Sequence, residues 1–271
     1  MRCFIFTCFF YVSCFTCSGQ RSFKGILLDS TTKQPVEFVN IGVIGKGIGT
    51  VTDEKGAYSI TIPDSLAAEK IKISMIGYQA KTYPVKAFRN LEQVLVSQTN
   101  VTLNEVQVSA KKTKVKIAGN HTTTKLVSAG YMKNNLGAEI AVKLNISHPK
   151  TQIRTFMVNI NANSINKLPL FRLNIYTVGE KGAPGENILQ KNIIIEPKEI
   201  TGLITFDLKP YRVFVDKDVF IAIEWIRDLG DVKGLYFSTK LIGSTTYARQ
   251  VSQDKWEHVP AGIGLHAEIA Y

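Results

Sequence analysis

The chain has 271 residues, of which 45% are hydrophobic and 20% are charged. This balance is typical of a globular protein with a buried core and excludes a chain that is disordered along most of its length. The length suggests one large domain or two modest ones. Lysine and arginine number 33 against 22 acidic residues, a formal net charge of +11. All four cysteines precede residue 18, which excludes a cysteine-based zinc site, a cysteine nucleophile and a disulfide further along the chain.

Residues 1–19 are typical of a secretory signal peptide. An apolar run over Phe4–Val12 is followed by the small residues of Cys17-Ser18-Gly19. The run is much shorter than the roughly 20 apolar residues that span a bilayer. We therefore expect an exported protein, located in the periplasm or at the outer membrane or cell surface. Membrane association is expected only if a lipid is attached at Cys14 or Cys17.

Residues 22–108 are predicted to form one β-sandwich. Short apolar runs alternate with turn residues every 8 to 12 positions or so, the spacing of an all-β sandwich or barrel. Strands are expected over Phe23–Leu28 and Val36–Ile44. A third strand is expected over Tyr58–Pro63, in which isoleucines alternate with polar residues.

Asp53 and Gly56 are predicted to shape the tight turn of a hairpin. The Asp53 side chain can accept hydrogen bonds from backbone amides two or three residues on, and Gly56 tolerates a left-handed conformation. The adjacent carboxylates of this turn point in different directions, so no metal site is expected there. Gly45, Gly47 and Gly49 are expected in a tight β connection, because no helix N-terminus follows that could bind phosphate.

The same segment resembles the carboxypeptidase regulatory-like domain, a small transthyretin-like β-sandwich found in exported proteins of Bacteroidetes-type bacteria. The matching motifs, in order, are Gly25-x-Leu27, Pro35-Val36-x-x-Val39-Asn40, Gly49-Thr50-x-Thr52-Asp53-x-x-Gly56-x-Tyr58, Ile62-Pro63 and Ser74-x-Ile76-Gly77-Tyr78. The resemblance implies a non-catalytic domain that accompanies a peptidase or a receptor. No histidine of this chain begins the His-x-x-Glu pair that a zinc carboxypeptidase requires, so no metal or other cofactor is expected.

Residues 109–124 are predicted to be a lysine-rich exposed linker. Four lysines fall within eight positions, and a polar, glycine-bearing stretch follows them. The alternative is a contact with an anionic surface, since such a run attracts phosphates or acidic polysaccharides. Nucleic acid is not expected as a partner, because no aromatic residues that could stack on bases are interleaved with the lysines.

Residues 125–271 are predicted to form a second, jelly-roll-like β-sandwich of about eight to ten strands. Around Phe171–Tyr176, apolar residues alternate with Arg172, Asn174 and Tyr176, which predicts one buried and one solvated face. The run Val219–Ile226 is apolar on both faces except at Glu224, which predicts a central strand. Trp225, inside this run, is predicted to lie in the core.

Trp256, His258 and Tyr247 are the candidate ligand-contacting residues. Trp256 lies in a polar stretch, where a partly exposed indole can stack on a sugar ring while its neighbours bind the hydroxyl groups. The alternative is that Trp256 folds back to cover an edge of the sandwich. Glu257 and His258 are neighbours in an extended segment and face opposite ways, so they are not expected to form an acid–base pair.

The sequence therefore predicts a non-enzymatic cell-envelope protein of two β-sandwiches, which binds another envelope protein or a polysaccharide. No catalytic residue is assigned. The alternative is a glycan hydrolase with two carboxyl groups facing each other roughly 5 to 9.5 Å apart across a cleft. The strand-borne candidates for that chemistry are Glu139, Asp207, Glu224 and Glu268.

Overall fold

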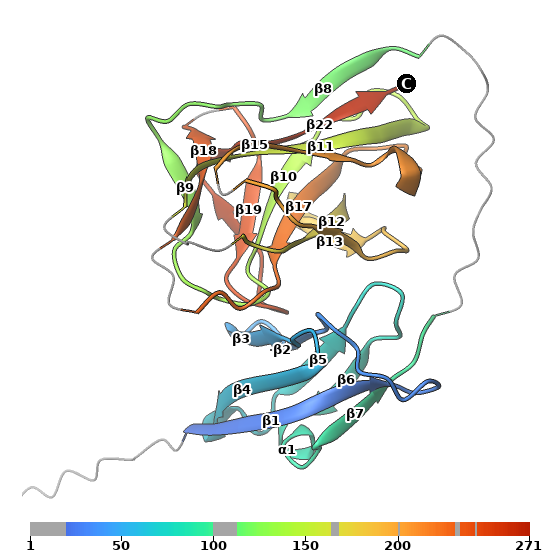
Figure 1. Cartoon of the computed structure of the whole chain (residues 1–271), viewed down its shortest axis with the longest axis vertical. Coiled ribbons are helices and arrows are strands. Elements are labelled where there is room, and N and C mark those ends of the chain that lie inside the picture. The colour runs from blue at the N-terminus through green and yellow to red at the C-terminus, as the bar shows by residue number, and fades with distance from the viewer. Residues whose placement is uncertain (1–19, 100–112, 164–167, 200, 231–233, 242) are drawn as a thin grey trace, which may run out of the picture.

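The computed structural model describes residues 20–99, 113–163, 168–199, 201–230, 234–241 and 243–271. Figure 1 shows two β-sheet bodies in contact: an N-terminal domain built from strands β1–β7 and a larger C-terminal domain built from strands β8–β22. The prediction of an all-β fold with two sandwiches is confirmed. Within the described residues no helix is both long enough and apolar enough to cross a membrane.

The N-terminal domain packs two small sheets against each other, with strand orders β4-β1-β7 and β3-β2-β5-β6. The strands are Gln20–Asp29 (β1), Asn40–Val43 (β2), Ile48–Val51 (β3), Ala57–Pro63 (β4), Lys70–Ser74 (β5), Lys81–Pro84 (β6) and Gln93–Val96 (β7), with a one-turn helix α1 at Val85–Phe88. Tyr58, Ile60 and Ile62 alternate inward along β4, as predicted. They share one apolar core with Ile41 of the opposite sheet and Phe88 of α1.

The predicted strand Val36–Ile44 is wrong in its first half, because β2 begins only at Asn40. Phe38 has a φ of +56°, a left-handed conformation that interrupts an extended strand. Its side chain leaves the domain core and packs in a small interdomain cluster with Val51 and Ile226.

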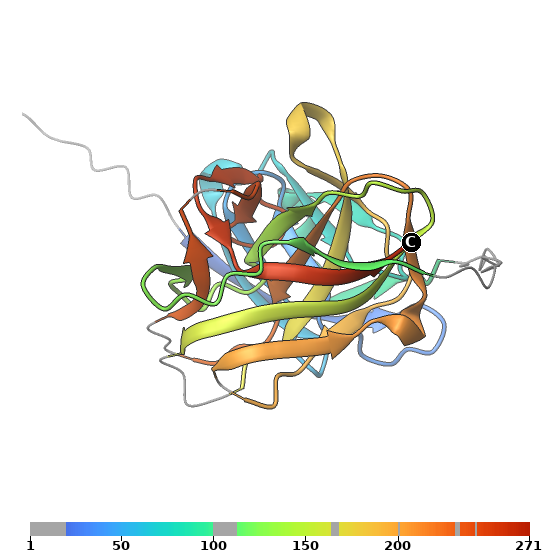
Figure 2. The ribbon, with the colours of Figure 1, turned by 90° about the horizontal axis from the view of Figure 1, so that it is seen from above.

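The C-terminal domain is a sandwich of two larger sheets. The first has the order β13-β12-β17-β10-β19-β20, with β14 also paired to β12; the second has the order β21-β18-β11-β22-β8, with β15 and β16 paired to β11 and β9 paired to β18. Trp225, Phe156 and Phe237 are fully buried between the sheets. Seen from above, β22 and β11 run side by side across the top of the domain (Figure 2).

The strands of the C-terminal domain are short. They are Val115–Gly119 (β8), Ser128–Tyr131 (β9), Glu139–Leu144 (β10), Thr151–Asn163 (β11), Phe171–Val178 (β12), Pro184–Asn187 (β13), Ile193–Ile195 (β14), Gly202–Asp207 (β15), Val213–Val215 (β16), Val219–Trp225 (β17), Leu235–Lys240 (β18), Thr246–Arg249 (β19), Glu257–Val259 (β20), Gly262–Ile263 (β21) and Leu265–Ala270 (β22). The described part of this domain thus holds more strands than the eight to ten predicted. Three-residue strands such as β14 and β16 are too short to show an alternating pattern in the sequence.

Two sequence predictions have opposite outcomes in this domain. Strand β17 lies between β12 and β10 with every residue buried, which confirms the predicted central strand and the core position of Trp225.

The predicted linker over 109–124 is too long, because Val115–Gly119 form β8 beside β22. The cause is the burial of Ala118, which is 7% exposed and packs in the core, although lysines surround it in the sequence.

The two domains are joined by a close backbone contact between the β2–β3 hairpin and the segment that precedes β20. A Cβ atom at Gly42 or Gly49 would lie 2.2 Å or 2.3 Å from the Ser252 carbonyl oxygen, so only glycine permits this approach. The Ser252 hydroxyl donates to Asn40 Oδ1 at 2.6 Å. The Gly45 N–H donates to the Gln253 carbonyl at 2.9 Å. The contact therefore fixes the N-terminal domain on the C-terminal domain.

Candidate functional site

The three candidate residues Trp256, Tyr247 and His258 lie together on the outer face of the β12–β17–β10–β19–β20 sheet. Tyr247 on β19 pairs in register with His258 on β20, and their ring centroids are 5.4 Å apart. Trp256 directly precedes β20 and contacts Tyr176 of β12 edge-to-face, with ring centroids 5.5 Å apart. Phe220 of β17 contacts Tyr247 and belongs to the same apolar cluster as Tyr176 and Trp256. We call these five rings the aromatic face.

Trp256 is partly folded back onto the sheet. The Arg249 guanidinium lies 4.9 Å from the centre of the indole, a cation–π contact. The Trp256 and Tyr247 side chains remain half-buried, and His258 is exposed. The sequence alternatives for Trp256 therefore both describe part of the geometry: one surface of the indole covers the sheet, and the residue still reaches solvent beside an exposed imidazole.

Beneath the aromatic face lies a buried ionic network. Glu139 of β10, which is 0% exposed, accepts a hydrogen bond from the Tyr176 hydroxyl at 2.9 Å. An Arg249 guanidinium nitrogen lies 2.5 Å from the other Glu139 oxygen. The same arginine thus supports Trp256 on one side and neutralises Glu139 on the other.

A second ion pair completes the network. Arg172 of β12 contacts Glu224 of β17 at 3.1 Å, with side chains 1% and 0% exposed. The Asn174 Nδ2 donates to Glu139 at 2.7 Å and to Glu224 at 3.0 Å, so one amide bridges both carboxylates. Arg172 also donates to the carbonyl of Phe38, which belongs to the N-terminal domain. We call Glu139, Arg249, Glu224, Arg172 and Asn174 the ionic network.

The burial of this network contradicts the predicted solvated face of β12. Arg172, Asn174 and Tyr176 are 1%, 2% and 7% exposed. The N-terminal domain and the segment that carries Trp256 cover this face, and the two glutamates of neighbouring strands compensate the charge. The sequence signal that could have revealed the pairing is Glu224, a single carboxylate within an apolar strand that requires a buried cation.

The electrostatics of the network follow from burial. Burial raises the pKa of Glu139, the Arg249 guanidinium opposes that shift, and the Glu224 carboxylate adds to it. Burial disfavours the charge of Arg249, but the Glu139 carboxylate beside it outweighs this and holds the pKa of Arg249 above its usual value. Burial also raises the pKa of the Tyr176 hydroxyl well above its usual value, so Tyr176 stays a neutral donor to Glu139.

The carboxylates considered for hydrolysis fall into two pairs. Glu139 and Glu224 are directly opposed in register on β10 and β17, but both are fully buried and each is held by an arginine. Asp207 and Glu268 lie on either side of Thr155 in neighbouring strands of the other sheet, on its open outer face. In the first pair, both carboxylates are therefore 0% exposed and engaged by arginines, whereas the second pair lies on an outer sheet face.

The remaining sequence predictions concern the N-terminal part of the chain. Asp53 Oδ1 accepts the N–H groups of Lys55 at 2.8 Å and Ala57 at 2.9 Å, and Gly56 has a φ of +71°. These residues form the turn between β3 and β4. The predicted signal peptide, with Cys14 and Cys17, lies outside the described residues. In the described ranges, no three His, Cys, Asp or Glu side chains gather closely enough to hold a metal ion.

Comparisons with known proteins identify one part of the chain. The family model of the CarboxypepD_reg-like domain matches residues 23–108. No curated protein matches the chain. Among solved structures, the chain is similar to the infectious bursal disease virus Gx strain, with 11% identity over 93% of this chain and 63% of that chain, and a TM-score of 0.29. It is also similar to the VP2 subviral particle of infectious bursal disease virus, with 12% identity over 93% of this chain and 63% of that chain, and a TM-score of 0.26. The chain spans less than two thirds of the length of these structures.

The match includes the described residues 23–99, which form the N-terminal domain with its two small sheets and the Asp53 turn. Domains of this family are non-catalytic β-sandwiches that serve regulation or binding. The sequence resemblance is therefore confirmed over this part of the chain. Residues 23–108 match the family model of the carboxypeptidase regulatory-like domain, and the described part of this range is a β-sandwich fixed to a second β-sandwich.

Proposed function

We propose that this protein is an exported, non-catalytic binding module of the cell envelope that contacts a polysaccharide through the aromatic face. The single observation that carries the proposal is the joint placement of Trp256, Tyr247 and His258 on one sheet face, above a neutralised and rigid polar layer. Half-exposed aromatic rings bury the apolar side of a sugar, and an imidazole donates or accepts a hydrogen bond with its hydroxyl groups. Export is supported by the leader-like residues 1–19.

The envelope location also leaves room for a protein partner, and the family of the N-terminal domain supports a binding role in general. The polysaccharide is favoured at this face because the exposed groups are rings and an imidazole rather than a broad apolar patch.

Attachment to a membrane then depends on a lipid at Cys14 or Cys17. Fractionation of cells that express the C14S/C17S variant separates an anchored form from a free one.

The test is a binding measurement with purified envelope polysaccharides, by affinity electrophoresis. We expect Trp256→Ala to weaken retention about tenfold or more, because loss of one sugar-stacking ring removes on the order of 1–2 kcal/mol. Tyr211→Ala is the matched control, since Tyr211 is 38% exposed and its ring contacts Phe206 of the opposite sheet at a tilted angle. Trp256→Phe keeps a ring over Arg249 and Tyr176 and separates loss of contact from loss of fold.

The proposal would be contradicted if a polysaccharide retained the wild type and the Trp256→Ala variant equally. Absence of retention by every polysaccharide, together with capture of one envelope protein, would replace the polysaccharide with a protein partner.

A glycan hydrolase remains the second candidate because Glu139 and Glu224 do face each other. It predicts release of reducing sugar that Glu224→Gln abolishes. The ion pairs described above favour binding without turnover, since both carboxylates are fully buried and each already contacts an arginine.

A further inference from the structure

The open edge of β9 is a second candidate binding surface. Among the described residues β9 pairs with β18 alone. The Thr239 N–H donates to the Val127 carbonyl at 3.0 Å, which fixes the phase of this antiparallel ladder. In such a ladder the hydrogen-bonded residues alternate, so Ala129 and Tyr131 bond to β18 while the backbone groups of Ser128 face the open edge.

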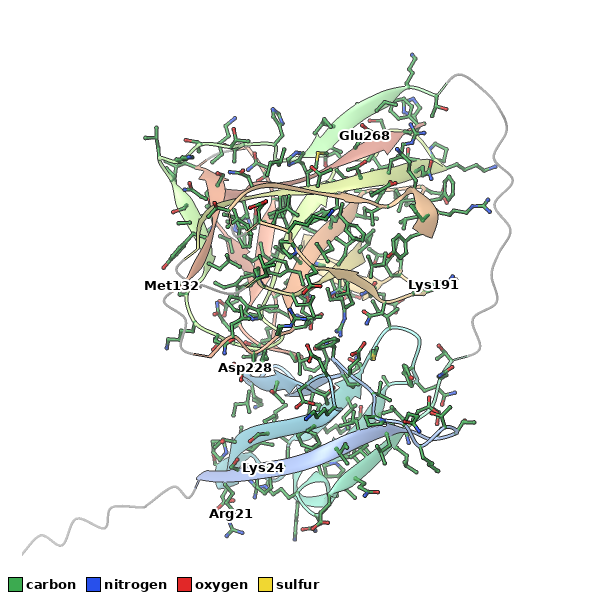
Figure 3. The ribbon with its side chains drawn as sticks, in the orientation of Figure 1. Arg21, Lys24, Met132, Lys191, Asp228 and Glu268 are labelled. Atoms are coloured by element: carbon green, nitrogen blue, oxygen red, sulfur yellow. The ribbon has the colours of Figure 1, made fainter. Side chains whose placement is uncertain are left out.

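The apolar surface of the described residues is concentrated at this edge. Leu126, Met132 and Leu241 are 94%, 72% and 67% exposed, more than any other large apolar side chain in the described ranges. Leu126 shortly precedes β9, Met132 directly follows it, and Leu241 directly follows β18, the strand that pairs with β9. Figure 3 shows Met132 at the outer margin of the C-terminal domain, beside β9. Exposed apolar residues that gather in this way mark an interaction site.

A cavity opens behind the same edge. It has a volume of about 420 Å³ and lies between β9 and strands β10, β19 and β20. Its apolar wall is formed by Met132, Ile140, Ala248, Val259 and Ile263. The volume is within the range of sites that take up a small ligand or a large side chain.

The charges around the edge select the kind of partner. Lys125 and Lys133 are exposed at its two ends, and Lys133 lines the cavity. Arg249 also lines the cavity, but its charge is matched by Glu139. Glu257 of β20 is also exposed. The two lysines at the strand therefore favour acidic side chains next to β9.

We propose that β9 and this cavity form a docking groove for an extended segment of a partner protein, in which apolar residues alternate with acidic ones. The segment adds a strand to the open edge of β9 through backbone hydrogen bonds. One of its apolar side chains enters the cavity beside Met132, and its acidic side chains approach Lys125 and Lys133. The cavity shares β19, β20 and Arg249 with the aromatic face, but the open edge of β9 and the rings of Trp256 and Tyr247 belong to different elements, so the protein has two binding surfaces.

The test uses a fluorescein-labelled peptide of about ten residues with alternating valine and glutamate, and fluorescence polarisation against the full chain. We expect saturable binding that Ser128→Pro weakens about tenfold or more, because proline removes the edge N–H without disturbing the bonds to β18. Met132→Glu is expected to weaken binding similarly, through loss of apolar contact and repulsion of the acidic peptide. Leu203→Glu is the matched control, since Leu203 is 54% exposed but lies on β15.

The melting temperature of each variant shows that it remains folded, and polysaccharide retention of Ser128→Pro should equal that of the wild type. This arm separates a failure of the groove from a failure of the proposed function. Absence of peptide binding, or equal binding by wild type, Ser128→Pro and Met132→Glu, would overturn the proposal. A concentration-dependent dimer that Ser128→Pro abolishes in sedimentation would assign the edge to a second copy of the chain and would overturn it too.

Discussion

Arg172 shows why the charges between the two domains matter for stability. Its guanidinium is 1% exposed and contacts Glu224, Asn192 and the Phe38 carbonyl. Removing one partner of a buried ion pair leaves the other charge uncompensated, which costs about 3–5 kcal/mol. An exposed pair contributes about 1 kcal/mol or less.

We expect Arg172→Leu to lower the free energy of unfolding by about 3–5 kcal/mol in urea denaturation. Lys143→Leu is the control, since Lys143 and Asp218 form a pair at 2.9 Å whose side chains are 28% and 35% exposed. The double variant R172L/E224L should regain most of the loss, because neither charge is then buried alone. Equal losses for Arg172→Leu and Lys143→Leu would show that the network is not stabilising.

The hydrogen bonds of the Asp29 carboxylate lead us to expect that the N-terminal domain loses stability in acid. The backbone amides of Thr32 and Thr31 donate to its carboxylate at 2.9 Å and lower the pKa of Asp29 from 3.8 to about 2. A lowered folded-state pKa stabilises the domain fully above the unfolded value, and the contribution is lost as the pH falls from about 4 to about 2. We expect Asp29→Asn, which keeps an acceptor oxygen, to flatten the unfolding free energy over this pH range. Parallel curves for the variant and the wild type would contradict this.

At the scale of elements, the sequence predicted the strands that bury one face and missed what lies on the other. The alternation along β4 and the apolar run of β17 were sufficient to predict their burial. The alternation along β12 was not, because its polar side chains are buried by a different domain. Periodicity reports which residues share a face and carries no information on what covers that face.

The candidate site shows the same limit. Trp256, Tyr247 and His258 could be named from composition and local polarity, and the structure brings them together through the pairing of β19 and β20. Tyr176 was missed as a support of Trp256, because it is distant in sequence and meets Trp256 only through sheet order. Arg249 is seven residues from Trp256 and was missed because the pairing of β19 with β20 is not visible in the sequence. Similarly, Gly49 was predicted to lie in a tight connection and Gly42 within a strand, whereas both glycines are required by the close approach of Ser252.

At the scale of the whole molecule, the regulatory-like domain is a fixed part of the structure. Backbone contacts at Ser252, the apolar cluster around Phe38 and the bond from Arg172 join it to the sheet that carries the aromatic face. The aromatic face and the cavity of the β9 groove use different side chains of β19 and β20 in the same sandwich. The two proposed binding surfaces are thereby held at a fixed separation in the molecule.

Hydrogen–deuterium exchange with and without a retained envelope polysaccharide tests the central claim most directly. The account predicts slower exchange over 246–249 and 255–259, the strands around Trp256, and unchanged exchange over 128–133. Protection confined to the regulatory-like domain, or none near Trp256 while the polysaccharide is bound, would contradict binding at the aromatic face.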